Sequence, residues 1–221
     1  MKRRPLILSA PWLLAGCGAS LLPKPGGESE RYRLDDLAGE AAAAAPMPGC
    51  TPGAPGAATL LVAVPSAAAG FDSNRMVYVR EPQRLQAFAQ SEWVDTPARL
   101  LAPLIVRALE QSGTFCAVLM APAAAVTSMR LVTELIRLQQ DFSTQPSQVR
   151  LSLRAWLIDT RTRQVLAWQV FDQTSVAATD TAAGGAAAAQ QASLRLVQKL
   201  ALFCAATVEG SSTASVRSLP R

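Results

Sequence analysis

Two consecutive alternating segments constrain the fold of this 221-residue chain more than any other feature. In residues 149–159 (VRLSLRAWLID) every odd position up to 157 is apolar, and residues 163–172 (RQVLAWQVFD) continue after a polar turn. A period of two is typical of a strand that buries one face, and two such strands around a short turn predict a hairpin. The apolar side of this hairpin needs a second layer, which helices can supply.

Two helices are predicted. The first has Thr96 as its N-cap, Pro97 at its first position and Gly113 just past its end. Its apolar face, which should pack on the sheet, is formed by Leu100, Leu101, Leu104, Ile105, Ala108 and Leu109. The second is an Ala-rich amphipathic helix over residues 181–204, with a stripe made of Leu194, Val197, Ala201 and Cys204. The Ser/Thr-rich residues 206–221 are expected to form a disordered tail.

Short apolar or alternating segments predict further strands at 31–34, 59–65, 76–81, 84–94 and 115–120. Residues 129–142 (MRLVTELIRLQQDF) are ambiguous, because their apolar positions also fit a helical stripe. Those positions are Leu131, Leu135, Leu138 and Phe142. If the hairpin needs a neighbour, this segment is the natural third strand.

The N-terminus has the layout of an export signal. Basic residues at positions 2–4 precede an apolar run, residues 5–16, that is too short to cross a bilayer. The following order, Leu14-Ala15-Gly16-Cys17, resembles the bacterial lipobox, in which the chain is cut before a diacylated cysteine. We therefore predict a signal peptide over 1–16 and lipid attachment at Cys17, where acyl chains would hold the protein on a membrane. The alternative is an ordinary secreted protein that keeps Cys17 as a free thiol.

The residues after Cys17 divide into a tether and one domain. In the sorting rule known for Gram-negative lipoproteins, Asp directly after the lipidated cysteine favours retention in the inner membrane. This chain has Gly18 at that position, which implies the outer membrane. Residues 17–57 include two Pro/Gly-rich stretches and are expected to form a flexible tether and loop. The ordered domain is expected over 58–205.

Composition excludes several classes of function. The formal charge of +5 falls to +2 without the leader, because Lys2, Arg3 and Arg4 leave 18 basic and 16 acidic residues. No basic block remains, so nucleic acid is not an expected partner. The chain has no histidine, which excludes Ser/His/Asp and Cys/His nucleophile pairs and histidine-containing metal sites. No catalytic residue, metal site or cofactor is predicted.

Three cysteines remain in the mature chain besides Cys17. In an oxidising compartment one disulfide is possible, and Cys116 with Cys204 is the pair to test, since Cys50 falls in the Ala/Pro/Gly-rich stretch. The favoured interpretation is that these cysteines are buried as small apolar side chains.

Two side chains stand out as candidate partner contacts. Trp93 lies just before the first helix, where a large aromatic residue can anchor an interface or, as the favoured interpretation, cover the helix end in the core. Arg75 belongs to FDSNR, which suits a recognition loop or a turn. Gly184-Gly185 lacks the GxxxxGK[ST] context of a phosphate loop, so a bent or frayed first helical turn is expected there.

Residues 72–115 carry an ordered set of features: an Asp/Arg/Tyr stretch before a strand, a Trp ahead of a Pro-started helix, and G-x-F at the helix end. This order resembles the ABC-type transport auxiliary lipoprotein family, whose PqiC-like members are partners of mammalian-cell-entry (MCE) domain transporters. The matching residues are Asp72, Arg75, Tyr78, Trp93, Pro97, Leu101, Leu104, Leu109, Gly113 and Phe115. With Tyr32, Leu34, Gln140-Asp141-Phe142 and the closing helix, the resemblance covers about residues 13–204.

The resemblance implies an α/β domain with a mainly antiparallel sheet, flanked by two principal helices, in which residues 129–142 form a strand. It further implies a non-enzymatic outer-membrane subunit that faces the periplasm and contacts an MCE-domain protein, whose ABC permease and ATPase are separate chains. A ring-forming homo-oligomer fits the same picture. A stand-alone carrier that holds a lipid between helix and sheet is the alternative, and a hydrolase would depend on Lys199 as its base.

Overall fold

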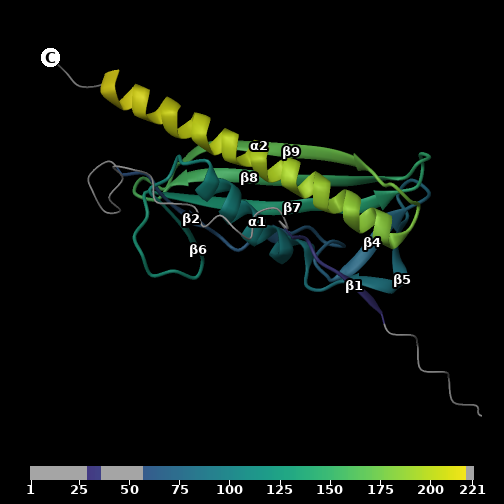
Figure 1. Ribbon diagram of the computed structural model, residues 1–221. Coiled ribbons are helices and arrows are strands. Elements are labelled where there is room, and N and C mark those ends of the chain that lie inside the picture. The colour runs from purple at the N-terminus through teal and green to yellow at the C-terminus, as the bar shows by residue number, and fades with distance from the viewer. Residues whose placement is uncertain (1–28, 36–56, 218–221) are drawn as a thin grey trace, which may run out of the picture.

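The computed structural model describes residues 29–35 and 57–217, with side chains to Gly210 (Figure 1). Cys17, the signal peptide and most of the expected tether lie outside the described residues. The elements in chain order are β1 (Glu30–Tyr32), β2 (Thr59–Val62), β3 (Ser66–Ala67), β4 (Arg75–Val79), β5 (Leu85–Trp93), α1 (Pro97–Gln111), β6 (Ala117–Met120), β7 (Met129–Asp141), β8 (Gln148–Asp159), β9 (Val165–Val176) and α2 (Ala182–Arg217).

Strand β7 is the spine of the sheet. One edge of β7 pairs along its whole length with β8, and β8 pairs with β9, both antiparallel. Along its other edge, β7 pairs in parallel with three short strands in succession, β2, β3 and β4. Strand β6 extends the sheet beyond β2, and β5 and β1 extend it beyond β4. The predicted hairpin is therefore confirmed as β8 and β9.

The sheet is mixed, and the expectation of a mainly antiparallel sheet was wrong. Among the described strands five pairings are parallel and three are antiparallel. Alternation in the sequence reveals each strand but not the direction in which it meets its neighbour. The short strands return to β7 through loops and α1, and such crossovers produce parallel pairs.

The ambiguous segment 129–142 is a strand, and its misleading periodicity has a structural cause. The β7–β8 register shifts between Leu135 and Arg137, which marks a bulge in β7. Before the bulge Leu131 and Leu135 are buried, and after it the next buried leucine is Leu138. An extra residue in a strand changes the phase of the side chains, so a three-residue step that imitates a helix appears within a strand.

Helices α1 and α2 pack against each other and lie on the same side of the sheet (Figure 1). Helix α2 covers β8 and β9, whereas α1 lies over β3, β6 and β7. The start and end of α1 are confirmed: Thr96 is the extended N-cap residue, its carbonyl accepts from Leu100 N at 3.0 Å, and Gly113 takes φ +66°. The core between the layers is rich in leucine, including Leu60, Leu101, Leu131, Leu135, Leu151, Leu153, Leu157, Leu196 and Leu200.

Helix α2 continues through residues 206–217, for which the sequence predicted disorder. Ser, Thr and Gly in this stretch are weak helix formers. Extending an existing helix costs much less than starting one, however. The packed part of α2 therefore serves as a nucleus for the turns that follow.

Two glycines let the first turns of α2 approach their surroundings. Thr181 Oγ1 accepts a hydrogen bond from Gly184 N at 3.1 Å, which caps the helix. A Cβ on Gly184 would lie 2.2 Å from the Thr179 carbonyl oxygen, and one on Gly185 would lie 2.1 Å from Gln140 Oε1. Gly184 thus permits close approach to the loop between β9 and α2, and Gly185 permits close packing of the helix start against the end of β7.

The possible disulfide between Cys116 and Cys204 is not formed. Cys116 is disulfide-bonded, but Cys204 is a free thiol, fully buried on the core face of α2. The apolar stripe that identified the helix also contains Cys204, and packing within that stripe determines its environment. Burial raises the pKa of the Cys204 thiol to about 12, so Cys204 serves as a small apolar core residue.

We expect Cys204 to resist thiol reagents in the native protein at pH 8 and to react as the chain unfolds in urea. The pKa of Cys204 in the folded state is raised above the ordinary value of 9.0, so folding favours the neutral thiol. The stabilisation that comes from burying this neutral thiol is complete below about pH 9 and is lost as the pH rises toward 12. Labelling followed by peptide mass spectrometry, alongside circular dichroism, checks this. Labelling of position 204 before the helical signal falls would contradict a buried site, and a Cys204→Ala variant identifies the labelled peptide.

Candidate docking surface on the open sheet face

The two faces of the sheet differ in cover. Odd residues of β8, such as Leu151 and Leu153, face α2 and are fully buried. Even residues of β8 point to the other side, which no helix covers in the part of the chain that the structure describes (Figure 1). We call this side the open face. Strands β7, β8 and β9 contribute to it Arg130, Val132, Glu134, Arg137, Gln139, Asp141, Gln148, Arg150, Ser152, Arg154, Trp156, Ile158, Val165, Trp168, Val170, Asp172, Thr174 and Val176.

One corner of the open face is apolar. Strand register places Trp156 opposite Val132 on one side and opposite Trp168 on the other. These three residues form one row of side chains across the sheet. The next row along the strands crosses β6, β2, β7, β8 and β9, and its one charged residue is Arg130. We call the apolar members of these two rows the tryptophan corner: Leu61, Leu119, Val132, Trp156, Ile158, Val165 and Trp168. Trp168 is 63% exposed, although tryptophan is usually well covered in a folded domain.

Arginines surround the tryptophan corner. The guanidinium of Arg154 lies 5.6 Å from the ring centre of Trp156, which is a cation–π distance. Arg130, at the start of β7, and Arg161 and Arg163, in the β8–β9 turn, are exposed. Tryptophan and arginine are the residues that most often carry binding energy in protein interfaces. The chemistry of this corner therefore suits a protein partner with acidic groups around an apolar centre.

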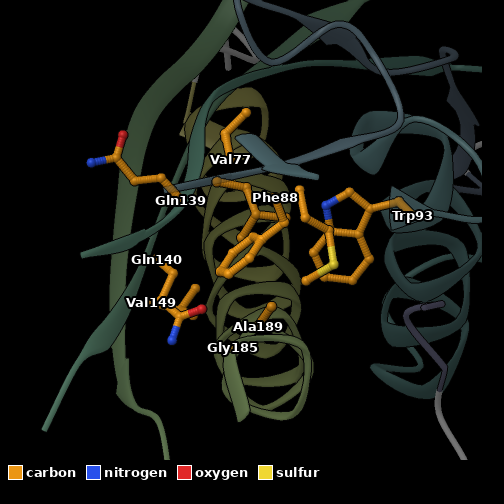
Figure 2. A pocket seen from close by; sticks show the side chains of 10 residues that line it. Val77, Phe88, Trp93, Gln139, Gln140, Val149, Gly185 and Ala189 are labelled. Carbon is orange, nitrogen blue, oxygen red and sulfur yellow. The ribbon is translucent and has the colours of Figure 1, made fainter. Parts of the chain in front are cut away.

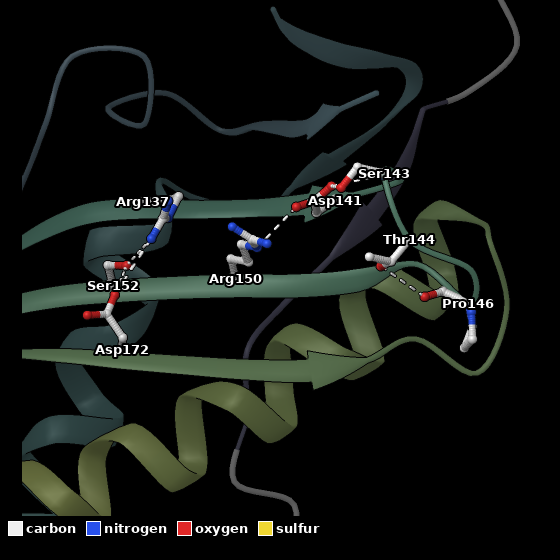
Figure 3. A network of polar contacts seen from close by, with 8 residues as sticks. All are labelled: Arg137, Asp141, Ser143, Thr144, Pro146, Arg150, Ser152 and Asp172. Atoms are coloured by element: carbon white, nitrogen blue, oxygen red, sulfur yellow. Dashed lines mark hydrogen bonds and ion pairs between the residues drawn. The ribbon is translucent and has the colours of Figure 1, made fainter. Parts of the chain in front are cut away.

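Apart from Val170 and Val176, the rest of the open face is polar, and its charged side chains pair with one another. Figure 3 shows two of these ion pairs, Arg137 with Asp172 and Arg150 with Asp141. Arg154 pairs with Glu134 at 3.2 Å. Arg137 Nη2 donates to Ser152 Oγ at 2.9 Å and lies 3.6 Å from an Asp172 carboxylate oxygen, which also accepts from Ser152. Because these charges are already paired, this part of the face offers less to a partner than the tryptophan corner does.

A second ion pair lies at the far end of the open face (Figure 3). Arg150 lies 3.0 Å from Asp141, which also accepts from Ser143 N at 2.9 Å and Ser143 Oγ at 2.6 Å. Burial alone would raise the pKa of Asp141, but the Ser143 hydrogen bonds and Arg150 outweigh it, and the pKa is lowered. This pairing stabilises the fold above the ordinary pKa of aspartate and is lost as the pH falls through the lowered value.

The two contact residues predicted from the sequence lie elsewhere. Trp93 is only 4% exposed, and its backbone N–H donates to the Asn74 carbonyl at 2.7 Å. It lines a cavity of about 10 Å³ together with Phe88, Gln140 and Gly185 (Figure 2), which is room for about one water molecule. Trp93 is thus a core residue, as the favoured interpretation of the sequence had it.

Arg75 is exposed at the start of β4, opposite Glu92 in the β4–β5 register. Strand β4 meets the end of β7 at Gln140 and Asp141, whereas the tryptophan corner lies around the start of β7. The structure therefore does not bring Arg75 and the corner together. The signal that could have revealed the corner is present in the hairpin, because Trp156, Ile158 and Trp168 occupy positions where a solvent-facing side would be polar.

The described residues contain no group of three or more His, Cys, Asp or Glu side chains placed to hold a metal ion. Among the described helices, none combines the length and apolar character needed to cross a membrane.

Comparison with known proteins identifies the family. The family model for the ABC-type transport auxiliary lipoprotein component matches residues 40–201. Protein XCC0632 from Xanthomonas campestris, of family DUF330, has a similar structure with a TM-score of 0.69 and 25% sequence identity, covering 84% of this chain and 99% of that one. A second solved structure, of an uncharacterized protein, has a TM-score of 0.61 at 12% identity, over 80% of this chain and 99% of that one. No curated protein matches the sequence. The chain belongs to the ABC-type transport auxiliary lipoprotein component family.

Proposed function

We propose that this protein is the non-enzymatic, outer-membrane subunit of an MCE-type ABC lipid transport system, anchored through acyl chains on Cys17 and facing the periplasm. Its tryptophan corner contacts the periplasmic MCE-domain protein. Membership of the auxiliary lipoprotein family supports a transport role. The lipobox order Leu14-Ala15-Gly16-Cys17 supports the anchor, and Gly18 supports the outer membrane.

The observation that carries the partner contact is the tryptophan corner on the open face. A stable monomer rarely exposes several large apolar side chains side by side, and such patches usually mark interaction sites. Here Trp168 and Val165 are both more than half exposed and adjoin Trp156 and Ile158. The core lies on the other side of the sheet, under α1 and α2, so the fold does not need these exposed side chains.

The alternative carrier function would place a lipid between the helices and the sheet. Leucines from both layers fill that space. The cavity beside Trp93 between β7 and α2 has about 10 Å³ and cannot hold an acyl chain. Two larger hollows, of about 480 and 530 Å³, are open at the surface and lined partly by charged or polar side chains, such as Asp141 and Arg150 in one and Glu30 and Thr181 in the other. The subunit function is therefore the one that the geometry supports best.

We expect Trp168→Ser to weaken recovery of the MCE-domain protein about 10- to 30-fold, as loss of an aromatic hot spot does. Its free energy of unfolding should stay within about 0.5 kcal/mol of wild type, because the side chain is exposed. The measurement is a pull-down from crosslinked envelopes with tagged protein, quantified by mass spectrometry. Leu202→Ser is the matched control, because Leu202 is 70% exposed on α2, on the helix side of the sheet. Equal recovery by both variants would place the contact outside the corner.

The anchor is tested separately. Intact mass of the membrane-extracted protein should show loss of residues 1–16 and added acyl chains, and the protein should fractionate with the outer membrane. Cys17→Ala should abolish both results. An unacylated, soluble wild-type product would contradict the lipid anchor.

A further inference from the structure

Strand β9 lies at the edge of the sheet. For each of its residues, the backbone N–H and C=O groups can be assigned as pointing toward β8 or away from the sheet. The strand pairs only with β8. Ala177 N, just after β9, donates to Ser147 O at 2.8 Å, which makes position 177 face β8. In an antiparallel pair this direction alternates, so the odd residues of β9 bond to β8 and the even residues face outward. Thr160 N donates to Ser128 O, next to β7, at 3.0 Å, which agrees with even residues of β8 bonding to β7 instead.

Along the outward side of β9, side chains hydrogen-bond to backbone carbonyls in one half, which we call the capped half. The other half, the open half, lacks such hydrogen bonds within the described residues. Toward the end of β9, the Thr174 carbonyl accepts from Arg195 Nη2 at 3.3 Å and the Asp172 carbonyl accepts from Gln173 Nε2 at 2.6 Å. Nearer the hairpin turn, the outward N–H and C=O groups of Trp168 and Val170 have no partner among the described residues. This open stretch adjoins the tryptophan corner.

Natural sheets usually protect such an edge with lysine, proline, short length or a covering segment. Strand β9 has twelve residues and contains neither lysine nor proline. A long strand with capped and open halves is suited to accept another strand at the open half.

We propose that the partner docks by strand addition: an extended segment pairs with the backbone of Trp168 and Val170 and lays an apolar side chain against the indole of Trp168. The segment is acidic at its flank, which complements the exposed Arg161 and Arg163 in the adjoining turn. This inference rests on the proposed function, in which the MCE-domain protein supplies the segment. Among the other described strands at the sheet edges, β1 and β6 have only three and four residues, so the described strand that a second copy of this chain could offer is its own β9. The dimer mass in the experiment below distinguishes that case from the partner's strand.

Proline substitution tests the pairing. The Val170 N–H points outward, so Val170→Pro removes a donor that the fold does not use, and edge strands tolerate proline at such positions. We expect Val170→Pro to bind the purified periplasmic part of the MCE-domain protein about tenfold more weakly or worse, because it leaves an acceptor on the added strand unsatisfied. Its thermal midpoint should stay within about 5 °C of wild type. Thr174→Pro, at an outward position in the capped half, should bind like wild type.

Hydrogen exchange on the wild-type protein provides a readout that does not depend on a variant. The amides of Trp168 and Val170 should exchange fast in the free protein and slowly with the MCE-domain protein bound. If the partner binds and these two amides stay fast, strand addition is wrong and the proposed function stands. If the partner does not bind wild type at all, both fail. Protection that appears with a dimer mass in light scattering, without partner, would assign the strand to a second copy and overturn this proposal.

Discussion

Trp93→Ala is expected to lower the free energy of unfolding by about 3–5 kcal/mol, the usual cost of removing a buried aromatic side chain. Trp93 is 4% exposed and belongs to the hydrophobic core, where it lies beside Met76 and Phe88. Its loss would leave a cavity between the end of β5 and the start of α2. Urea unfolding followed by circular dichroism at 222 nm measures the effect.

Trp168→Ala is the matched control, since it removes the same side chain from an exposed position and should change stability by no more than about 0.5 kcal/mol. The two substitutions should thus have different effects: loss of Trp93 should lower the free energy of unfolding, and loss of Trp168 should weaken partner binding. If Trp93→Ala kept its stability and lost the partner, Trp93 would be a contact residue and its assignment to the core would be wrong.

Gly185→Ala is the second large effect, an expected loss of about 1–3 kcal/mol, as for other overpacked cores. The new Cβ would lie 2.1 Å from Gln140 Oε1. Gln140 is 3% exposed and its Nε2 donates to Ser147 Oγ at 2.8 Å, so moving the side chain away disturbs a buried hydrogen bond. Either the amide or the start of α2 has to shift. Urea unfolding again gives the magnitude.

Gly210→Ala in the same helix is the control. Nothing lies within 4 Å of its added Cβ, so the substitution should be neutral or stabilise the helix by up to about 1 kcal/mol. A double-mutant cycle with Gln140→Ala should recover at least about 0.5 kcal/mol of the loss at Gly185. Similar effects of alanine at positions 185 and 210 would show that close packing at Gly185 is unimportant.

Local signals in the sequence predicted much of the fold. The alternation of Leu151 and Leu153 identified β8, and Thr96, Pro97 and Gly113 marked the bounds of α1, because these signals depend on neighbouring residues only. Properties that depend on distant residues were not predictable in this way. They include the parallel pairing of β2, β3 and β4 with β7, and the bulge after Leu135 that imitates a helical step.

The site depends even more on tertiary context. Trp93 and Trp168 are the same residue type within predicted strands, and only the placement of α1 and α2 on one face decides that the first is buried and the second exposed. The same placement buries Cys204 as a free thiol, so the possible disulfide with Cys116 is not formed. The rows of the tryptophan corner combine residues from five strands, and strand register cannot be read from any one of them.

The most direct test of the central claim is photo-crosslinking in living cells from a photoreactive phenylalanine analogue at position 168. Position 202, an exposed site on α2, is the control. The proposed docking surface predicts a crosslink to the MCE-domain protein from position 168 and none from position 202. A crosslink from position 202 alone, with none from 168, would contradict the claim that the open face of the sheet contacts the transporter.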